Sequence, residues 1–378
     1  MTRAAARAYV RGAMDADAFR AAGLWDPYAP DAADRLRVLS WLVERGMTVD
    51  EIVRELRTRP LPALTADVGL RPWKRLTLAG LAARTGLPAE RIAAISLAAG
   101  VLPAAADVPA FSEDDVPTFL AFAGGAGLFG DVAVRRFTRV MGSALAAIAD
   151  AAISLFLVTL ERPIVERGGN ETALAVANLE AMERLELVPT ALRGLFRAHL
   201  EQAIRRSRAA RDPLDVETAR LTVGFVDLVG FTALSRRVAT RDLNEVIDRF
   251  EDAAHEIATL RGGRIVKLVG DEVMFVTLGA AAGCDIALTL VEQFAGDATI
   301  RPRGGLATGD LLVRGGDYYG PVVNLAARLA ELAVPGELLV NAEVADEARD
   351  GALAFRAAGK RLPKGFDAPV EVLSVERG

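Results

Sequence analysis

The hydrophobic pattern of this 378-residue chain changes its period near residue 215. Before that point apolar residues recur at helical spacing, and no strand-like alternation of any length is present. After it, short apolar runs alternate with amphipathic segments and glycine-rich turns. Because strands and helices that interleave in this way build α/β sandwiches, the pattern predicts an all-helical N-terminal half and an α/β C-terminal half.

Composition limits the class of protein further. Hydrophobic residues make up 52% of the chain and charged residues 25%, which excludes wholesale disorder. A net charge of −5 argues against a protein that mainly neutralises nucleic-acid phosphates. The single cysteine, Cys284, excludes an intramolecular disulfide, and the two histidines, His199 and His255, disfavour a histidine-rich metal centre.

The longest apolar stretch covers residues 142–160, which is about the length that spans a bilayer. It is rich in alanine and carries Asp150 near its middle. We interpret it as a core helix and expect no membrane span. The N-terminus is basic but lacks the apolar run of a secretory signal, so we expect a soluble, cytoplasmic protein.

Local signals divide the helical half into short helices. Thr48 followed by Glu51 predicts a capping box. Residues 76–92 predict a helix that ends at Gly86, followed by a second helix with Pro88 in its first turn. Further helices are expected to separate at Gly124-Gly125 and Gly168-Gly169.

The pair of helices at residues 76–97 resembles a helix-turn-helix DNA-binding motif in its order of helix, turn and helix. Its second helix carries Arg91 as its only cation, so phosphate anchoring would be thin. A packed helical pair is therefore our interpretation, with a DNA-binding regulator as the alternative, and we expect no nucleic-acid partner.

A long helix over residues 190–211 is predicted to connect the halves, before a break at Asp212-Pro213. The predicted domains are thus a regulatory domain at 1–189, a connecting helix at 190–213 and a catalytic domain at 214–378. His199 lies on the apolar stripe of the connecting helix. A buried, hydrogen-bonded histidine is one interpretation, and a pH switch that acid would charge is the other. His255 is expected to be a surface or packing residue.

Two acidic residues stand out in the second half. Asp227 ends an apolar strand, and Asp271 sits in a tight turn between two strands. Two such carboxylates can hold Mg²⁺ or Mn²⁺, although aspartate is also an ordinary turn residue. Asn324 and Arg328 are four residues apart, so they share one face of a helix. Together they could orient a sugar and neutralise a phosphate, or they could simply face solvent. The strands are predicted at residues 221–227, 264–269, 272–277, 303–308 and 311–314, and the helices at 242–261 and 280–294.

Taken together, these motifs resemble the catalytic domain of class III nucleotidyl cyclases over residues 220–375. The resemblance is carried by four segments: Phe225-Val-Asp-Leu-Val-Gly-Phe-Thr, Lys267-Leu-Val-Gly-Asp, Gly320-Pro-Val-Val-Asn-Leu-Ala-Ala-Arg and Leu362-Pro-Lys-Gly-Phe-Asp-Ala-Pro-Val. It implies a ferredoxin-like α/β domain that turns ATP into 3′,5′-cyclic AMP and pyrophosphate with two divalent cations. It also implies a homodimer whose two active sites are each built from both subunits.

The resemblance implies a role for each matching residue. Asp227, Asp271 and the backbone carbonyl of Leu228 would bind the metals, Lys267 and Asp317 would read adenine, Asn324 would orient the ribose, and Arg328 would stabilise charge on the α-phosphate. Guanylyl cyclases of this family carry Glu and Cys at the two base-reading positions, so Lys and Asp imply ATP.

The helical half more loosely resembles the regulatory domain of some actinobacterial soluble cyclases, which restrains catalysis and responds to pH. That resemblance adds a fatty acid as a candidate ligand. Two alternatives stay open for the second half. One is a nucleotide-binding signalling dimer without turnover. The other is a diguanylate cyclase, whose Gly-Gly-Asp-Glu-Phe hallmark is matched only in part by Val269-Gly-Asp-Glu-Val.

Overall fold

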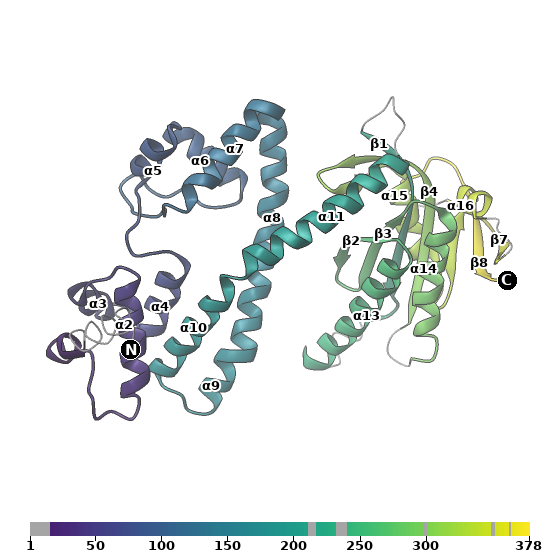
Figure 1. The fold of residues 1–378 in the computed structure, drawn as a ribbon. Coiled ribbons are helices and arrows are strands. Elements are labelled where there is room, and N and C mark those ends of the chain that lie inside the picture. Colours follow the sequence, from purple (N-terminus) through teal and green to yellow (C-terminus); the bar gives the residue numbers. More distant parts are fainter. Residues whose placement is uncertain (1–15, 211–216, 232–239, 298–300, 349–351, 363) are drawn as a thin grey trace. The chain divides into compact units, whose positions relative to one another are not determined.

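The computed structural model describes residues 16–210, 217–231, 240–297, 301–348, 352–362 and 364–378. The chain forms two compact units, Met1–Phe196 and Arg197–Gly378. The first is helical and the second is α/β, as the change in hydrophobic period predicts (Figure 1). The boundary between the units falls inside helix α11 (Val188–Ala210). The predicted break at Asp212-Pro213 lies outside the described residues, and the three predicted domain ranges stay a prediction.

The helical unit contains two small hydrophobic cores. Helices α2, α3, α4 and α10 share one core, and α5, α6 and α7 contribute to the other. The bounds are α2 (Ala32–Glu44), α3 (Val49–Leu56), α4 (Leu61–Leu70), α5 (Leu78–Thr85), α6 (Ala89–Ala98), α7 (Asp115–Phe129), α8 (Asp131–Phe156), the π-helix η1 (Leu157–Glu161), α9 (Arg162–Glu166) and α10 (Glu171–Leu185).

Helix ends in this unit follow the local sequence signals in most places. The hydroxyl of Thr48 accepts from the backbone N–H of Glu51, and the Glu51 carboxylate accepts from the backbone N–H of Thr48, which completes the predicted capping box. Gly86 ends α5 in the left-handed conformation, at φ +70°. The expected break at Gly124-Gly125 is wrong, because both residues lie inside α7. Each glycine costs a helix only about 1 kcal/mol relative to alanine, which packing of the rest of the helix can offset.

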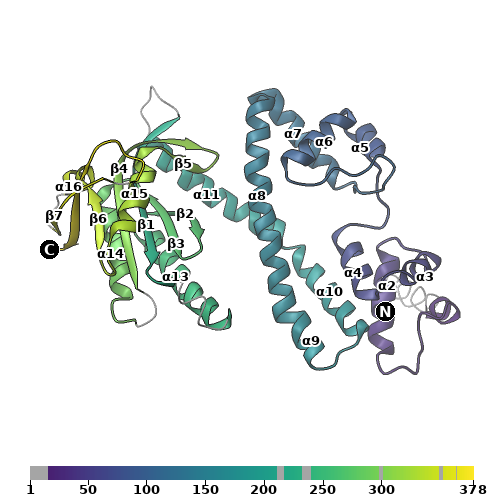
Figure 2. The same ribbon diagram turned by 180° about the vertical axis from the view of Figure 1, so that it is seen from behind.

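Helices α8, η1 and α9 run without interruption from Asp131 to Glu166, and both views show this rod (Figures 1 and 2). The expectation of a core helix over residues 142–160 is wrong within this chain, because none of the most apolar window is buried. Apolar composition predicted burial, but the described residues leave these side chains uncovered. Among the described residues, this helix alone is long and apolar enough to cross a membrane, which by itself is weak evidence of a span.

The α/β unit is an eight-stranded sheet with helices on both faces. The strand order is β2-β3-β1-β4-β6-β8-β7, and β5 pairs with β4. The bounds are β1 (Thr218–Leu228), α13 (Thr240–Leu260), β2 (Arg264–Val269), β3 (Glu272–Thr277), α14 (Ala280–Gln293), β4 (Pro302–Arg314), β5 (Asp317–Tyr319), α15 (Pro321–Leu332), β6 (Leu338–Asn341), α16 (Ala342–Glu347), β7 (Leu353–Arg361) and β8 (Val370–Arg377).

Alternation along the central strand β1 assigns side chains to the two faces of the sheet. Val226 and Leu228 pack with α13, α14 and α16 on one face, whereas Val223 and Phe225 pack with α15 on the other. Asp227 follows in the second series, so its side chain belongs to the α15 face. The two strands predicted at 303–308 and 311–314 are a single strand, because pairing with β1 continues through Gly309 and Asp310.

Helix α15 lies unusually close to the sheet at Gly305 of β4. A Cβ at this position would overlap the backbone nitrogen of Ala330 and the carbonyl oxygen of Ala326, both in α15. The absence of a side chain therefore allows the helix backbone to rest directly on β4. This contact fixes the position of the helix that carries Asn324 and Arg328.

Replacing this glycine is therefore expected to displace α15. Gly305→Ala should lower the free energy of unfolding by about 1–3 kcal/mol, since the added methyl group meets backbone that cannot rotate away. Gly296→Ala is the matched control, because a Cβ there meets nothing within 4 Å. Urea unfolding followed by circular dichroism measures both, and equal stabilities of the two variants would contradict the close packing of α15 on β4.

Candidate active site

Two of the predicted metal ligands are held side by side at the end of the central strands. Asp227 lies at the end of β1, and Asp271 lies in the turn between β2 and β3. The backbone N–H of Leu228 donates to the carbonyl oxygen of Asp271 at 3.2 Å, which anchors the strand end to the turn. The sequence placed one acid on a strand and the other in a turn, and the fold brings them together.

Two further charged residues flank Asp227, and neither was predicted as a site residue from the sequence. Asp227 pairs across the ladders with Glu272 of β3 and with Arg303 of β4. Residues directly opposite each other in a ladder point to the same face, so the three side chains form one row. The Nε and Nη2 atoms of Arg303 donate to Oδ2 of Asp227 at 3.1 and 2.9 Å. Only the strand register, which the sequence did not provide, would have revealed this row.

The row and its neighbouring turn concentrate negative charge in a partly buried place. Burial raises the pKa of Asp271, and the charge of Asp227 raises it further. Burial also raises the pKa of Glu272 to about 7, with additional contributions from Asp227, Glu331 and Asp271. Arg303 opposes both shifts but does not cancel them. The site therefore carries more negative charge than its own cation balances.

This donor set fits a hard divalent cation. Carboxylates and a backbone carbonyl are the ligands that Mg²⁺ and Mn²⁺ prefer, and the surplus negative charge would be relieved by a cation. Within the described ranges, no three acidic, histidine or cysteine side chains converge as a preformed metal cage. Asp227, Asp271 and the carbonyl of Leu228 would thus leave coordination positions for ligands from a substrate.

The two predicted base-reading residues are in direct contact. Nζ of Lys267, on β2, lies 2.9 Å from Oδ2 of Asp317, on β5. Oδ1 of Asp317 accepts from the backbone N–H of Tyr318 at 2.9 Å. Burial acts to raise the pKa of Asp317, but the hydrogen bonds from Lys267 and Tyr318 outweigh it and the net pKa is lowered. The carboxylate is therefore ionised and oriented, and half-exposed Lys267 can turn to a ligand.

Asn324 and Arg328 both lie on α15, as their spacing predicts. Nη1 of Arg328 donates to Oε2 of Glu331 one turn further along the helix, at 2.6 Å. In the described part of the chain, the structure records no direct hydrogen bond or ion pair from Asn324 or Arg328 to Asp227 or Asp271. The acids and the helical residues thus stand as two separate groups in one chain.

The connecting helix differs from expectation. His199 is exposed, and no residue of α11 is buried, so the buried histidine is wrong for this chain. The predicted apolar stripe is equally exposed, at 59% for both Leu195 and Phe196. The pH-switch hypothesis for His199 therefore lacks the burial on which it rested. His255 is exposed, in agreement with its predicted surface position.

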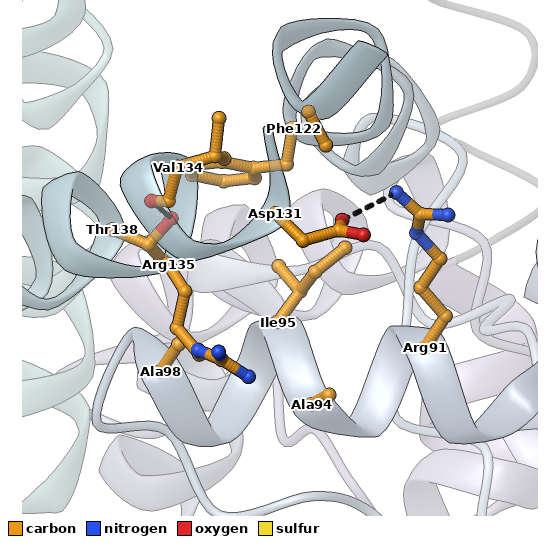
Figure 3. A pocket seen from close by; sticks show the side chains of 10 residues that line it. Arg91, Ala94, Ile95, Ala98, Phe122, Asp131, Val134, Arg135 and Thr138 are labelled. Atoms are coloured by element: carbon orange, nitrogen blue, oxygen red, sulfur yellow. Dashed lines mark hydrogen bonds and ion pairs between the residues drawn. The ribbon is translucent and has the colours of Figure 1, made fainter. Parts of the chain in front are cut away.

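A cavity of about 270 Å³ lies in the helical unit, between α6, α7 and α8 (Figure 3). Its walls include Ile95, Phe122 and Val134, and Arg91 is paired with Asp131 at its edge. None of the predicted catalytic or metal-binding residues lines it.

Comparisons with known proteins place the chain in a family. An uncharacterised protein of Mycobacterium tuberculosis is 33% identical over 364 residues, which is 94% of this chain and 93% of that protein. The adenylate cyclase of Streptomyces coelicolor is 36% identical over 241 residues, 63% of this chain and 62% of that protein. The pH-sensitive adenylate cyclase of M. tuberculosis is 28% identical over 366 residues, 92% of this chain and 89% of that protein.

Among solved structures, the adenylyl cyclase CyaB from P. aeruginosa is 29% identical, with a TM-score of 0.39. That match covers 42% of this chain and 96% of the other. A comparison with protein-family profiles found no match. The chain belongs to the class III nucleotidyl cyclases. Within that class it is a member of the actinobacterial adenylyl cyclases in which an N-terminal helical domain precedes the cyclase domain.

The raised pKa of Glu272 predicts how stability depends on pH in the metal-free protein. A carboxyl group whose pKa is higher in the folded state stabilises the fold below its unfolded value of 4.5, and that stability is lost as pH rises through about 7. The melting temperature in a chelator should therefore fall between about pH 5 and about pH 8.

The variant Glu272→Gln should melt at a higher temperature than the wild type at about pH 8 and should flatten this dependence, because the amide cannot ionise. Glu371→Gln, at an exposed position of β8, should retain the wild-type dependence. If Glu272→Gln melts with the wild-type pH dependence, Glu272 is not the group responsible.

Proposed function

We propose that this protein is an adenylate cyclase that converts ATP into 3′,5′-cyclic AMP and pyrophosphate at sites shared by two copies of the chain. The observation that carries the proposal is the ion pair between Lys267 and Asp317, which is already formed in the single chain. An ionised aspartate accepts a hydrogen bond from the exocyclic amine of adenine, and a lysine donates to a ring nitrogen. Guanine presents a carbonyl oxygen where adenine has the amine, so this pair favours ATP.

The residues of the site divide the reaction between them. The 3′-hydroxyl of ATP loses its proton to solvent and attacks its own α-phosphorus. The bond from that phosphorus to the oxygen shared with the β-phosphate breaks, and pyrophosphate leaves. Two divalent cations, Mg²⁺ or Mn²⁺, would lower the pKa of that hydroxyl and neutralise charge on the phosphates. Asp227, Asp271 and the Leu228 carbonyl would hold these cations. Asn324 would orient the ribose, and Arg328 would place positive charge where the α-phosphate gains negative charge.

A homodimer accounts for the separation of these groups in one chain. Asp227 and Asp271 of one subunit would face Lys267, Asp317, Asn324 and Arg328 of the other, and a two-fold axis would repeat the arrangement. Arg328 is held by Glu331 in the single chain. It would exchange that partner for the triphosphate when the second subunit brings the substrate within reach.

The helical unit is proposed to regulate this activity. The similarity to a pH-sensitive adenylate cyclase extends over 92% of this chain, so it includes the helical half. A pH response of this protein is therefore part of the proposal, and so is the cytoplasmic location expected from the sequence. The fatty acid suggested by the looser resemblance receives no support from the comparisons. The pH switch at His199, which is exposed in the single chain, stays a prediction.

The direct test is an assay of the full-length chain with ATP and with GTP, in Mg²⁺ and in Mn²⁺, across a range of pH. We expect cyclic AMP to form and Asp317→Ala to reduce the rate on ATP by at least about tenfold, since one lost base contact corresponds to roughly 1–3 kcal/mol. Binding of ATP without any product would favour the signalling dimer without turnover, and a preference for GTP would contradict the assigned base readers.

Mixed dimers test the sharing of sites. Asp227→Ala and Arg328→Ala should each abolish measurable activity alone, because each removes a group from both sites of its homodimer. Mixing the two variants should restore about a quarter of the wild-type activity, since random pairing makes half the dimers mixed and each of those has one intact site. Chromatography must first show that mixed dimers form, and mixed dimers without activity would contradict shared sites.

A further inference from the structure

The sequence did not predict Arg303 as a site residue, and the proposed reaction gives it no role. Its side chain is 23% exposed and that of Asp227 is 19% exposed, so the pair is largely withdrawn from solvent. Both donors from Arg303 go to the same oxygen, Oδ2, at 3.1 and 2.9 Å. Oδ1 of Asp227 receives neither of them.

The remaining arm of the same guanidinium is committed elsewhere. Nη1 of Arg303 donates to the backbone carbonyl of Glu331 at 2.7 Å and to that of Ala333 at 3.1 Å. These carbonyls belong to the C-terminal end of α15, where the helix itself offers no donors. Because the guanidinium is planar and rigid, a movement of Asp227 is transmitted to the end of α15.

A continuous chain of polar contacts results. Asp227 is bound to Arg303, Arg303 is bound to the backbone of Glu331, and the Glu331 carboxylate is bound to Arg328. Three contacts thus connect the proposed metal ligand with the residue proposed to act on the α-phosphate.

We propose that Arg303 is a positioning residue that serves as resident counter-cation to Asp227 and couples cation binding there to the helix that carries Asn324 and Arg328. The inference rests on the proposed function for the role of Asp227. In the proposed dimer, Asp227 and Arg328 of one chain serve different sites, so the contact also connects the two sites with each other.

Removing the positive charge of Arg303 distinguishes a role as counter-cation from a purely structural role. Arg303→Gln leaves the negative cluster without its counter-cation, so Mn²⁺ alone should bind to the chelator-treated protein about three- to tenfold more tightly. Turnover should fall about tenfold or more, because α15 loses its anchor. A variant that only damaged the fold would weaken both. Titration of Mn²⁺ by electron paramagnetic resonance measures the affinity, and the cyclase assay measures turnover.

Arg303→Lys keeps the charge but not the planar fork. We expect it to bind Mn²⁺ with nearly wild-type affinity, while hydrogen exchange of the amides at the end of α15 becomes faster. In the wild type, Mn²⁺ should change exchange at these same amides, and in Arg303→Gln it should not. Arg356→Gln, at an exposed position of β7 on the same sheet, is the control and should behave as wild type in every measurement.

The outcomes distinguish the two proposals. If Asp227→Asn does not weaken Mn²⁺ binding by the wild-type chain, the assignment of the metal site itself fails. If Asp227→Asn weakens binding but Arg303→Gln leaves the Mn²⁺ affinity unchanged or lower, the metal site stands and the role of Arg303 is overturned. If Mn²⁺ leaves the exchange of α15 unaltered in the wild type, the coupling is overturned. Melting curves identify any variant that does not fold, and Arg303→Lys then carries the test.

Discussion

The concentration of carboxylates at one end of the central strands is the constraint on which the site depends. Asp227 and Glu272 pair where β1 ends and β3 begins, Asp271 lies in the adjoining turn, and Arg303 donates to Asp227. Burial makes each negative charge costly, which is visible in the raised pKa values of Asp271 and Glu272. A fold that keeps such a cluster holds electrostatic free energy that a divalent cation can release. Affinity for the cation and instability of the metal-free site therefore have the same physical origin.

Much of this unit could be predicted from the sequence because its elements are short and strongly patterned. The strands Arg264–Val269 and Glu272–Thr277 have the predicted bounds, and Lys267 contacts Asp317. The roles that the family resemblance implies for the motif residues stay predictions. Register could not be predicted in the same way. Arg303 looks like an ordinary basic residue at the start of a strand until the ladder sets it opposite Asp227. The strand β4 was divided in two at Gly309-Asp310 for the same reason, since only pairing with β1 shows that it continues.

Burial in the helical half was harder to predict from the sequence, because apolar composition does not show what an apolar surface packs against. The stretch at residues 142–160 has the composition of a core helix, yet its side chains lie on the surface of this chain. The apolar stripe on α11 is likewise exposed although its composition predicts burial, and His199 on that stripe is exposed too. Helical periodicity correctly predicted that these segments are helices with an apolar face. It carried no information on whether that face is covered within one chain.

The close packing of α15 on β4 determines where the proposed catalytic residues Asn324 and Arg328 lie. Helix α15 rests on Gly305 near its middle and is held by Arg303 at its C-terminal end, so its position is defined at two points. One point is a steric contact that does not depend on charge, whereas the other is a hydrogen bond from the same guanidinium that contacts Asp227, the proposed metal ligand. A charge change at Asp227 can therefore act on one end of the helix while the other contact stays fixed, and such a change would tilt α15 rather than shift it. Arg328 lies between the Ala326 and Ala330 contacts and Asn324 lies outside them, so a tilt would move Asn324 further than Arg328 relative to the sheet.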